Sequence, residues 1–314
     1  MSIISVDLAN GSVKIVSSTY QDCYPNRLQR LYGMEFNHFD TEIVTYKYNN
    51  KEFIINNKGL TSGGRNSNRY FTEEYLIELL IAISKATTDE KNDIVLLLPC
   101  EDYKNKKIIA QIKETLLGRY ELKVNGISRI IYINSIRVIA QPFGTLIHYL
   151  INSDGEFIDD RNKFTYALID IGQSTTDIIV TDGIKLEKIE GFNIGCMDIT
   201  NRFLNLVNNS RTDIKLIRND VSKTFNPIIK KYDEVFNFTD EMNNAKLITV
   251  EEIKTSINDS GIDLLSVDRC IYCGGGSMLL KDYLIKNRNE KLYPSAQMSN
   301  AKGGYIYGRV RCNG

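Results

Sequence analysis

Short runs of apolar and β-branched residues alternate along the chain with segments whose apolar residues recur at helical spacing. The first two runs are Ile3–Leu8 and Val13–Ser17, and the pair Asn10-Gly11 between them is typical of a tight chain reversal. The chain is therefore expected to open with a β-hairpin. The same reasoning predicts strands at Thr41–Tyr48, Glu52–Asn56, Asp93–Leu98, Glu121–Val124 and Ser128–Ile133, and helices at Tyr75–Lys85, Tyr103–Leu117 and Pro142–Ile151.

A polar stretch in the middle of the chain, Asn152–Lys163, interrupts the apolar pattern and is the best candidate for a domain boundary. After it the order of the first half starts again, with a strand at Phe164–Asp170, a loop, and a strand at Thr176–Thr181. The sequence therefore predicts two domains that begin alike. Further strands are expected at Lys185–Ile189 and Asp268–Tyr272, and helices at Ile194–Val207, in the Asp213–Phe225 region and at Thr249–Ser260, where Thr249 and Glu252 have capping-box spacing.

Composition and charge exclude several classes of protein. The 314 residues carry zero formal net charge, so no basic field favours nucleic acid or a lipid surface, and any DNA contact is expected to be indirect. The apolar runs fall far short of the ~20 residues of a membrane-spanning helix. The first residues do not show the pattern of a secretion signal, so secretion is not expected. Scattered cysteines favour reduced thiols in a cytoplasm. Cys270 and Cys273 form a lone CxxC without further metal-site spacing, so ordinary packing is expected there.

The two predicted hairpins share one pattern, in which an Asp near a strand end is followed by small polar residues and a second strand. Asp7 precedes residues 9–12 in the first copy, and Asp170 precedes residues 172–175 in the second. Repeated units commonly present equivalent loops to a shared cleft, so both loops are expected to line one cleft. For either copy alone, a turn-forming Asp without further function is the alternative. The joint occurrence of both copies with a later Gly-Gly-Gly and the segment Asn300–Tyr305 favours a functional role.

Phosphate binding explains these residue types. Small turn residues let backbone N–H groups approach an anion, hydroxyl groups add donors, and Lys14 supplies a neutralising cation. Two carboxylates would repel a polyphosphate by themselves, but a hydrated Mg²⁺ makes Asp7 and Asp170 suitable ligands, directly or through water. The candidate phosphate-binding residues are Asn10, Gly11, Ser12 and Lys14 in the first loop and Gly172, Gln173, Ser174 and Thr175 in the second.

In this order the motifs resemble the actin, sugar-kinase and chaperone-ATPase superfamily, and within it the bacterial ParM/StbA plasmid-segregation actins, which are similarly compact. The resemblance implies an α/β, actin-like (ribonuclease H-like) duplicated two-lobed fold with a nucleotide cleft between the lobes. It assigns residues 1–151 plus 298–314 to the first lobe and residues 152–297 to the second. Asp7–Lys14 would be phosphate loop one, Asp170–Asp177 phosphate loop two, and Gly274, Gly275, Gly276 and Ser277 the adenosine loop.

The resemblance also implies roles for single residues. Gln141, at the start of a helix, would orient the attacking water and act with Asp7 and Asp170 in slow hydrolysis. Gly195 would lie in the loop entering the helix beside the ribose, and Gly303 in a helix passing close beneath the nucleotide. The alternatives are a helix-start Gln without a catalytic role, and simple close packing. Ala9 and Asn10 depart from the small residues usual in loop one, and Ser62–Arg69 is expected to be a mobile surface loop.

The function implied is that of an ATPase, or a GTPase, that uses Mg²⁺, polymerises with itself and moves plasmid DNA. A DNA-bound adaptor of the ParR type on a centromere-like site would link filament and cargo, without membrane contact. Alternatives are a small-molecule kinase, in which an Asp base would replace Gln141, a chaperone-type ATPase, a non-plasmid cytoskeletal actin, and a nucleotide-binding scaffold without turnover.

Overall fold

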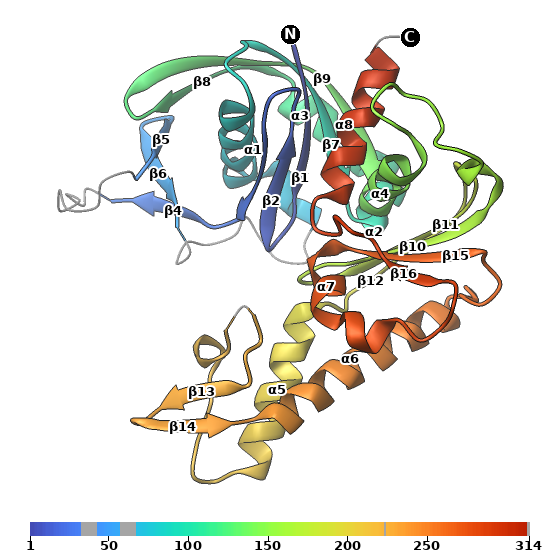
Figure 1. The fold of residues 1–314 in the computed structure, drawn as a ribbon. Coiled ribbons are helices and arrows are strands. Elements are labelled where there is room, and N and C mark those ends of the chain that lie inside the picture. Colours follow the sequence, from blue (N-terminus) through green and yellow to red (C-terminus); the bar gives the residue numbers. More distant parts are fainter. Residues whose placement is uncertain (33–42, 57–66, 223, 313–314) are drawn as a thin grey trace. The chain divides into compact units, whose positions relative to one another are not determined.

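The computed structural model describes residues 1–32, 43–56, 67–222 and 224–312 (Figure 1). By its internal contacts the chain forms two compact units. Met1–Lys163 and Met298–Gly314 make up unit 1, and Phe164–Gln297 makes up unit 2. Residues 152–163 belong to unit 1 in this division.

Unit 1 is built on a mixed sheet whose described strands follow the order β3-β2-β1-β7-β9-β8-β5-β6-β4. Their bounds are β1 Ser2–Leu8, β2 Ser12–Val16, β3 Gln21–Pro25, β4 Leu28–Leu31, β5 Thr45–Tyr48, β6 Lys51–Ile55, β7 Lys91–Leu98, β8 Gly118–Val124 and β9 Ile127–Ala140. Strands β1, β7 and β9 run parallel, whereas β2 pairs antiparallel with β1. The carboxyl ends of the three parallel strands therefore meet at one edge of the sheet, the edge where ligands bind in open α/β sheets.

Helices cover both faces of this parallel core. The described helices of unit 1 are η1 Ser67–Phe71, α1 Glu73–Ala86, α2 Cys100–Lys104, α3 Lys106–Leu116, α4 Gln141–Leu150, η2 Arg161–Lys163 and α8 Ser299–Cys312. Alternate residues of β7 show the two faces. Ile94 and Leu96 belong to the core that includes α1, whereas Val95 and Leu97 form a smaller cluster against Phe143 of α4 and Tyr307 of α8. Burial on both faces explains why β7 is a continuous apolar run.

Helices α4 and α8 cross at very short range. A Cβ on Gly144 would lie 2.9 Å from Asn300 Cα, and a Cβ on Gly303 would lie 2.5 Å from the Gly144 carbonyl carbon. Beside the crossing, the buried Thr145 hydroxyl lies 2.6 Å from Ser299 Oγ and donates a 2.6 Å hydrogen bond to Asn300 Oδ1. Small residues thus fix the first turns of both helices against each other.

Unit 2 repeats the topology of unit 1. Its main sheet follows the order β12-β11-β10-β15-β16, with β10 antiparallel to β11 and parallel to β15, just as β1 pairs with β2 and β7. The strands are β10 Thr165–Ile171, β11 Thr176–Asp182, β12 Lys185–Phe192, β15 Arg269–Cys273 and β16 Glu290–Leu292, with a separate hairpin of β13 Ile228–Lys231 and β14 Glu234–Asn237. The internal duplication read from two sequence motifs therefore extends to whole sheets.

The helices of unit 2 enclose one apolar core that includes Phe203, Met242 and Ile253. Their bounds are α5 Cys196–Ser210, η3 Arg218–Asp220, α6 Thr239–Asp259 and α7 Gly274–Leu284. Across the described part of the chain, no helix combines the length and the apolar character that a bilayer crossing requires.

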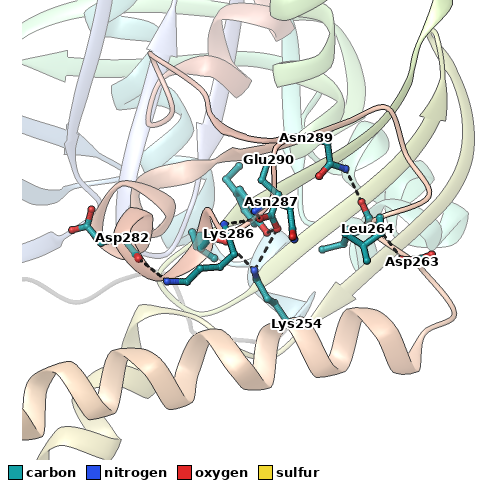
Figure 2. Close-up of polar contacts among 11 residues, drawn as sticks. Lys254, Asp263, Leu264, Asp282, Lys286, Asn287, Asn289 and Glu290 are labelled. Carbon is teal, nitrogen blue, oxygen red and sulfur yellow. Dashed lines mark hydrogen bonds and ion pairs between the residues drawn. The ribbon is translucent and has the colours of Figure 1, made fainter.

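A buried carboxylate fixes the end of α7 (Figure 2). Glu290 accepts hydrogen bonds from the backbone N–H groups of Lys286 and Asn287, at 2.8 and 2.7 Å, and from the Tyr272 hydroxyl at 2.9 Å. Lys254 of α6 lies 3.3 Å from the same carboxylate and donates to the Leu284 carbonyl. Burial would raise the pKa of Glu290, but these donors lower it below its usual value. The chain that follows α7 is thereby tied to β15 and α6.

One helix prediction was wrong, and another gave the wrong start. The Asp213–Phe225 region contains only the short η3 among its described residues, because its apolar side chains Ile214 and Leu216 pack as an extended segment into the core. Helix α6 begins at Thr239 rather than at Thr249. The Thr249 hydroxyl donates to the Ala245 carbonyl one turn earlier, so the capping-box spacing lies inside a longer helix whose first half is largely polar.

Candidate functional site

Asp7 is the centre of a cluster of polar side chains in unit 1. The cluster lies at the edge of the sheet where the parallel strands end. The Asp7 side chain is fully buried near the end of β1. Oδ2 accepts a 2.9 Å hydrogen bond from Lys14 Nζ, which faces Asp7 across the hairpin. Oδ1 accepts a 2.7 Å hydrogen bond from Gln141 Nε2. The sheet order brings these residues together because β9, which ends at Ala140 next to Gln141, is separated from β1 only by β7.

The bond to Asp7 fixes the orientation of the Gln141 amide. With Nε2 directed at a carboxylate, Oε1 points to the other side of the planar amide group. An amide oxygen held in this way is a hydrogen-bond acceptor for a water molecule, without being a base strong enough to remove its proton. Gln141 therefore has the geometry for orienting a water, and Asp7 supplies the anchor.

The turn of phosphate loop one, residues 9–12, lies between the last paired residues of β1 and β2. Leu8 pairs with Val13, so the loop joins directly paired strand positions. Two residues that the sequence analysis did not assign to the site, Asn26 and Arg69, contact it. The Asn10 side chain accepts a hydrogen bond from Arg69. Residues 62–66 of the expected surface loop lie outside the described residues, but Ser67–Phe71 is a 3₁₀ helix in which Arg69 is buried, contrary to that expectation.

The turn of phosphate loop two, residues 172–175, joins Ile171 of β10 to Thr176 of β11. It has the same length as the turn of loop one. The loop closes on itself through a 2.8 Å hydrogen bond from Gly172 N–H to the Thr175 carbonyl. The carbonyls of Gly172 and Gln173 accept from the N–H groups of Cys196 and Met197, at 3.2 and 2.8 Å. The start of α5 therefore holds loop two from its carbonyl side.

Gly195 makes that close contact between loop two and α5 possible. A Cβ at Gly195 would lie 2.8 Å from the Gln173 carbonyl group. Its N–H donates a 2.8 Å hydrogen bond to Asp198 Oδ2, so Asp198 closes the first turn of the helix and its charge favours this helix end. Burial raises the pKa of the neighbouring Cys196 thiol to about 12, which keeps it protonated near neutral pH.

The polar side chains of loop two are largely engaged within unit 2. Ser174 Oγ lies 3.3 Å from Met197 Sδ, and the Thr175 hydroxyl donates a 3.2 Å hydrogen bond to Asp177 Oδ2. Asp170 and Asp177, both buried, are direct cross-strand partners. Like charges placed opposite each other destabilise a strand pair, so this arrangement favours a nearby cation.

The glycines at the start of α7 lie against loop two. Gly274 has a φ of +81°, and a Cβ there would overlap Asp170 Oδ1 and lie 2.5 Å from the Ile171 carbonyl oxygen. Gly276 faces Ile171 and Cys196, whereas the space around Gly275 is open. The buried Ser277 hydroxyl donates to the Cys273 carbonyl within the helix. Gly274 and Gly276 therefore permit a close approach, and Gly275 leaves backbone exposed.

The structure brings the candidate residues together in two groups, one in each unit. Unit 1 gathers Asp7, Lys14, Gln141 and loop one, whereas Gly303 lies at the crossing of α8 with α4. Unit 2 gathers loop two, Gly195 and the α7 glycines. The described residues contain no group of three or more metal-binding side chains. Because both oxygens of Asp7 already accept hydrogen bonds, Asp7 fits water molecules around a hydrated Mg²⁺ better than direct coordination.

Two protein-family models match the chain, and their ranges fall one in each unit. The model for the N-terminal domain of actin-like proteins matches residues 5–144. The model for the C-terminal domain of archaeal, MreB-like actin homologues matches residues 168–286. Comparison with curated protein sequences gives no match.

Solved structures of similar fold cover nearly the whole chain. The apo form of pSK41 ParM is 19% identical, with a TM-score of 0.74 over 99% of this chain and 98% of that one. A 15-stranded ParM filament from Clostridium botulinum is 20% identical, with a TM-score of 0.77 over 98% and 99%. The archaeal actin homologue Ta0583 in complex with ADP is 16% identical, with a TM-score of 0.76 over 99% and 100%. At these identities the likeness is one of fold.

Proposed function

We propose that this chain, which belongs to the actin-like proteins and has their two-lobed α/β fold, is a nucleotide-dependent, filament-forming ATPase or GTPase that segregates plasmid DNA. The observation that carries the proposal is the group of Asp7, Lys14 and Gln141. It combines an anchored amide, a cation and a small-residue loop at the carboxyl ends of parallel strands. These are the parts that phosphoryl transfer to water needs, because its catalysis rests on positioning and charge stabilisation.

In this proposal both phosphate loops serve one nucleoside triphosphate. Residues 10–12 and 173–175 offer backbone N–H groups, and Lys14 offsets the negative charge of the phosphates. Gly274 and Gly276 let the start of α7 approach loop two closely enough for Gly275 to present exposed backbone to the nucleoside. Gly195 allows α5 to support the same loop.

Mg²⁺ would be held through water by Asp7 in unit 1 and by Asp170 in unit 2. When bound, the ion would neutralise charge on the β- and γ-phosphates. The pairing of Asp170 with Asp177 supports a cation on the side of loop two. On the side of loop one, Lys14 and Gln141 compensate the Asp7 charge when no metal is bound.

Hydrolysis would depend on Gln141, whose amide oxygen accepts a hydrogen bond from the attacking water. An amide cannot take the proton as a carboxylate base would, so turnover is expected to be slow. Slow hydrolysis suits a filament, because subunits add with a triphosphate and are destabilised after phosphate is released. A sugar kinase would need a carboxylate at the position of Gln141.

The assembly proposed is a homopolymer in the cytoplasm, linked to a centromere-like plasmid site by a DNA-binding adaptor of the ParR type. The filament of the Clostridium botulinum relative, which matches nearly the whole chain, supports self-association. The zero net charge supports an adaptor over direct DNA binding, because phosphate contacts from Lys and Arg dominate affinity for DNA.

Sedimentation of the purified protein tests this proposal. With Mg²⁺ and either ATP, GTP or a non-hydrolysable analogue, the protein should pellet above a critical concentration, and it should stay in the supernatant without nucleotide. DNA alone should not pellet with the filaments until an adaptor is added. A protein that stays monomeric with every nucleotide, but turns over ATP only when sugars or small acids are added, would be a kinase.

A further inference from the structure

Two residues outside the first hairpin, Asn26 and Arg69, hold phosphate loop one by its acceptor groups. The Asn26 side chain donates a 2.9 Å hydrogen bond to the Ala9 carbonyl, and its backbone N–H donates to the Gly11 carbonyl at 3.3 Å. Arg69 donates a 2.5 Å hydrogen bond to the Leu8 carbonyl and a second one to Asn10 Oδ1. Acceptors at four successive positions, Leu8 to Gly11, are thus engaged by these two residues.

Arg69 is a buried cation beside two aromatic rings. It is 7% exposed, and its guanidinium carbon lies 5.1 Å from the ring centre of Tyr70 and 5.6 Å from that of Tyr75. Its Nε is buried, and within the described parts of the chain no hydrogen-bond acceptor reaches it. Burial lowers the pKa of Arg69, but the neighbouring rings and the carboxylates of Glu78 and Asp102 raise it above its usual value overall. The environment thus stabilises the charge, and the reason for placing a cation here is to be sought in its contacts with the loop.

Comparison of the two loops supplies that reason. In unit 2 the carbonyls of Gly172 and Gln173 are held by backbone N–H groups at the start of α5. In unit 1 side-chain donors partly replace them. The Ala9 carbonyl, which corresponds to that of Gly172, accepts from Asn26, and Arg69 binds the Leu8 carbonyl and the Asn10 side chain beside it. The replacement also accounts for Asn10, a residue unusual for this loop, because its side-chain oxygen serves as an acceptor for Arg69.

The hydrogen bonds of the carbonyls determine where the N–H groups of the loop point. In a trans peptide the C=O of one residue and the N–H of the next point in opposite directions. With the Ala9 and Gly11 carbonyls directed at Asn26, the N–H groups of Asn10 and Ser12 point away from it. Those N–H groups are the donors that a phosphate would use, and the fixed carbonyls hold them in place beforehand.

We infer that Arg69 and Asn26 are positioning residues for phosphate binding, which fix loop one from its carbonyl side and thereby preorganise its N–H groups for a polyphosphate. The guanidinium also adds a fixed positive charge beneath the loop, where the low dielectric strengthens its field. This inference rests on the proposed function, since it presumes that loop one binds phosphates.

The test compares Arg69 with a second arginine that makes the same kind of contact elsewhere in unit 1. Arg129 donates hydrogen bonds to the carbonyls of Ser84 and Thr87, at 2.6 and 2.5 Å, near the end of α1. The variants Arg69→Gln and Arg129→Gln each remove a charge and a pair of carbonyl contacts. The unfolding temperature and the dissociation constants for the preferred triphosphate and for its nucleoside are measured for both, with Mg²⁺ present.

Arg69→Gln should weaken triphosphate binding about tenfold to a hundredfold, the range for losing hydrogen bonds from a charged group. Its affinity for the nucleoside should stay unchanged, and Arg129→Gln should bind both ligands as the wild type does. If Arg69→Gln does not fold, Arg69→Lys and Asn26→Ser provide the same comparison with smaller losses.

Two outcomes would overturn the inference. One is wild-type triphosphate affinity in the Arg69 variants, and the other is an equal loss for triphosphate and nucleoside, which would mean a general structural role. A wild-type protein that binds no nucleoside triphosphate would instead contradict the proposed function, so the two failures can be told apart.

Discussion

The side-chain amide of Gln141 donates a 2.7 Å hydrogen bond to the buried carboxylate of Asp7. The two residues lie 134 positions apart in the sequence. The bond joins the first residue of α4 to the end of β1 and fixes which side of the amide is left to accept a hydrogen bond. It also gives Asp7 a role that does not require it to act as a base. The carboxylate anchors both Gln141 and Lys14.

Loss of the Gln141 amide should slow hydrolysis more than it weakens binding. In Gln141→Ala the water loses its acceptor, and kcat should fall at least about tenfold, or ~1.4 kcal/mol in activation free energy. The nucleotide dissociation constant should change little. Phosphate release and equilibrium binding measure the two effects, with Gln111→Ala on the exposed side of α3 as the control. Unchanged phosphate release would contradict the role assigned to Gln141.

Removal of Lys14 should destabilise unit 1 even without nucleotide. In Lys14→Met the buried Asp7 carboxylate loses its cation, and breaking a buried pair from one side costs about 3–5 kcal/mol. The double variant Lys14→Met/Asp7→Asn should recover part of that loss, because the remaining charge is removed as well. Urea unfolding of the single and double variants checks this coupling. Strictly additive losses would show that the two side chains do not stabilise each other.

Gly274 and Gly275, at the start of α7, should differ in their tolerance of a methyl group. Gly274→Ala places a side chain at a φ of +81° and against the Ile171 carbonyl, so it should cost at least about 2 kcal/mol. Gly275→Ala meets nothing within 4 Å and should change stability by no more than about 0.5 kcal/mol. Thermal unfolding of the two variants provides a matched comparison. Equal effects would contradict the geometry described for this turn.

Stability should fall on acidification through His148. Burial, together with the nearby Lys302, lowers the pKa of His148 from 6.5 to about 4. The unfolded chain therefore takes up a proton at higher pH than the folded one, so the contribution of this residue is complete above pH ~6.5 and is lost towards pH ~4. Allowing for partial exposure, the loss should be roughly 2 kcal/mol.

The variant His148→Asn isolates that contribution. Its unfolding free energy should depend less on pH between about 4 and 6.5 than that of the wild type, with little difference between the two slopes above this window. Unfolding curves recorded at several pH values provide the measurement. Parallel curves for both proteins across the whole range would show that His148 does not titrate as described.

The repeated hairpins and their loops could be predicted because their signals are local. The hairpin of β1 and β2 was predicted correctly from the pair Asn10-Gly11 and the apolar runs on either side. The equal lengths of the two loops follow from the matched positions of Asp7 and Asp170. The helix predicted at Pro142–Ile151 is also confirmed as α4. In these segments a short stretch of chain contains both the strand or helix pattern and the residues that end it.

The contacts that shape loop one could not be predicted in the same way. Arg69 lies 59 positions from Asn10, and no sequence pattern connects a buried arginine with carbonyls on a distant hairpin. The surrounding polar residues Ser67 and Asn68 indicated a surface loop, whereas the aromatic pair Tyr70 and Phe71 was the available sign of burial. The first half of α6 was missed for a related reason, since its polar residues hide the spacing of Met242 and Ala245.

The proposal of a filament-forming nucleotidase is best tested by recording light scattering and phosphate release at the same time. The record starts when Mg²⁺ and ATP or GTP are added to the purified protein. We expect that scattering rises first and phosphate appears after a delay, and that Gln141→Ala lengthens the delay while filaments still form. Phosphate release at full rate from a protein that never scatters light, or tight nucleotide binding with neither signal, would contradict a filament-forming nucleotidase.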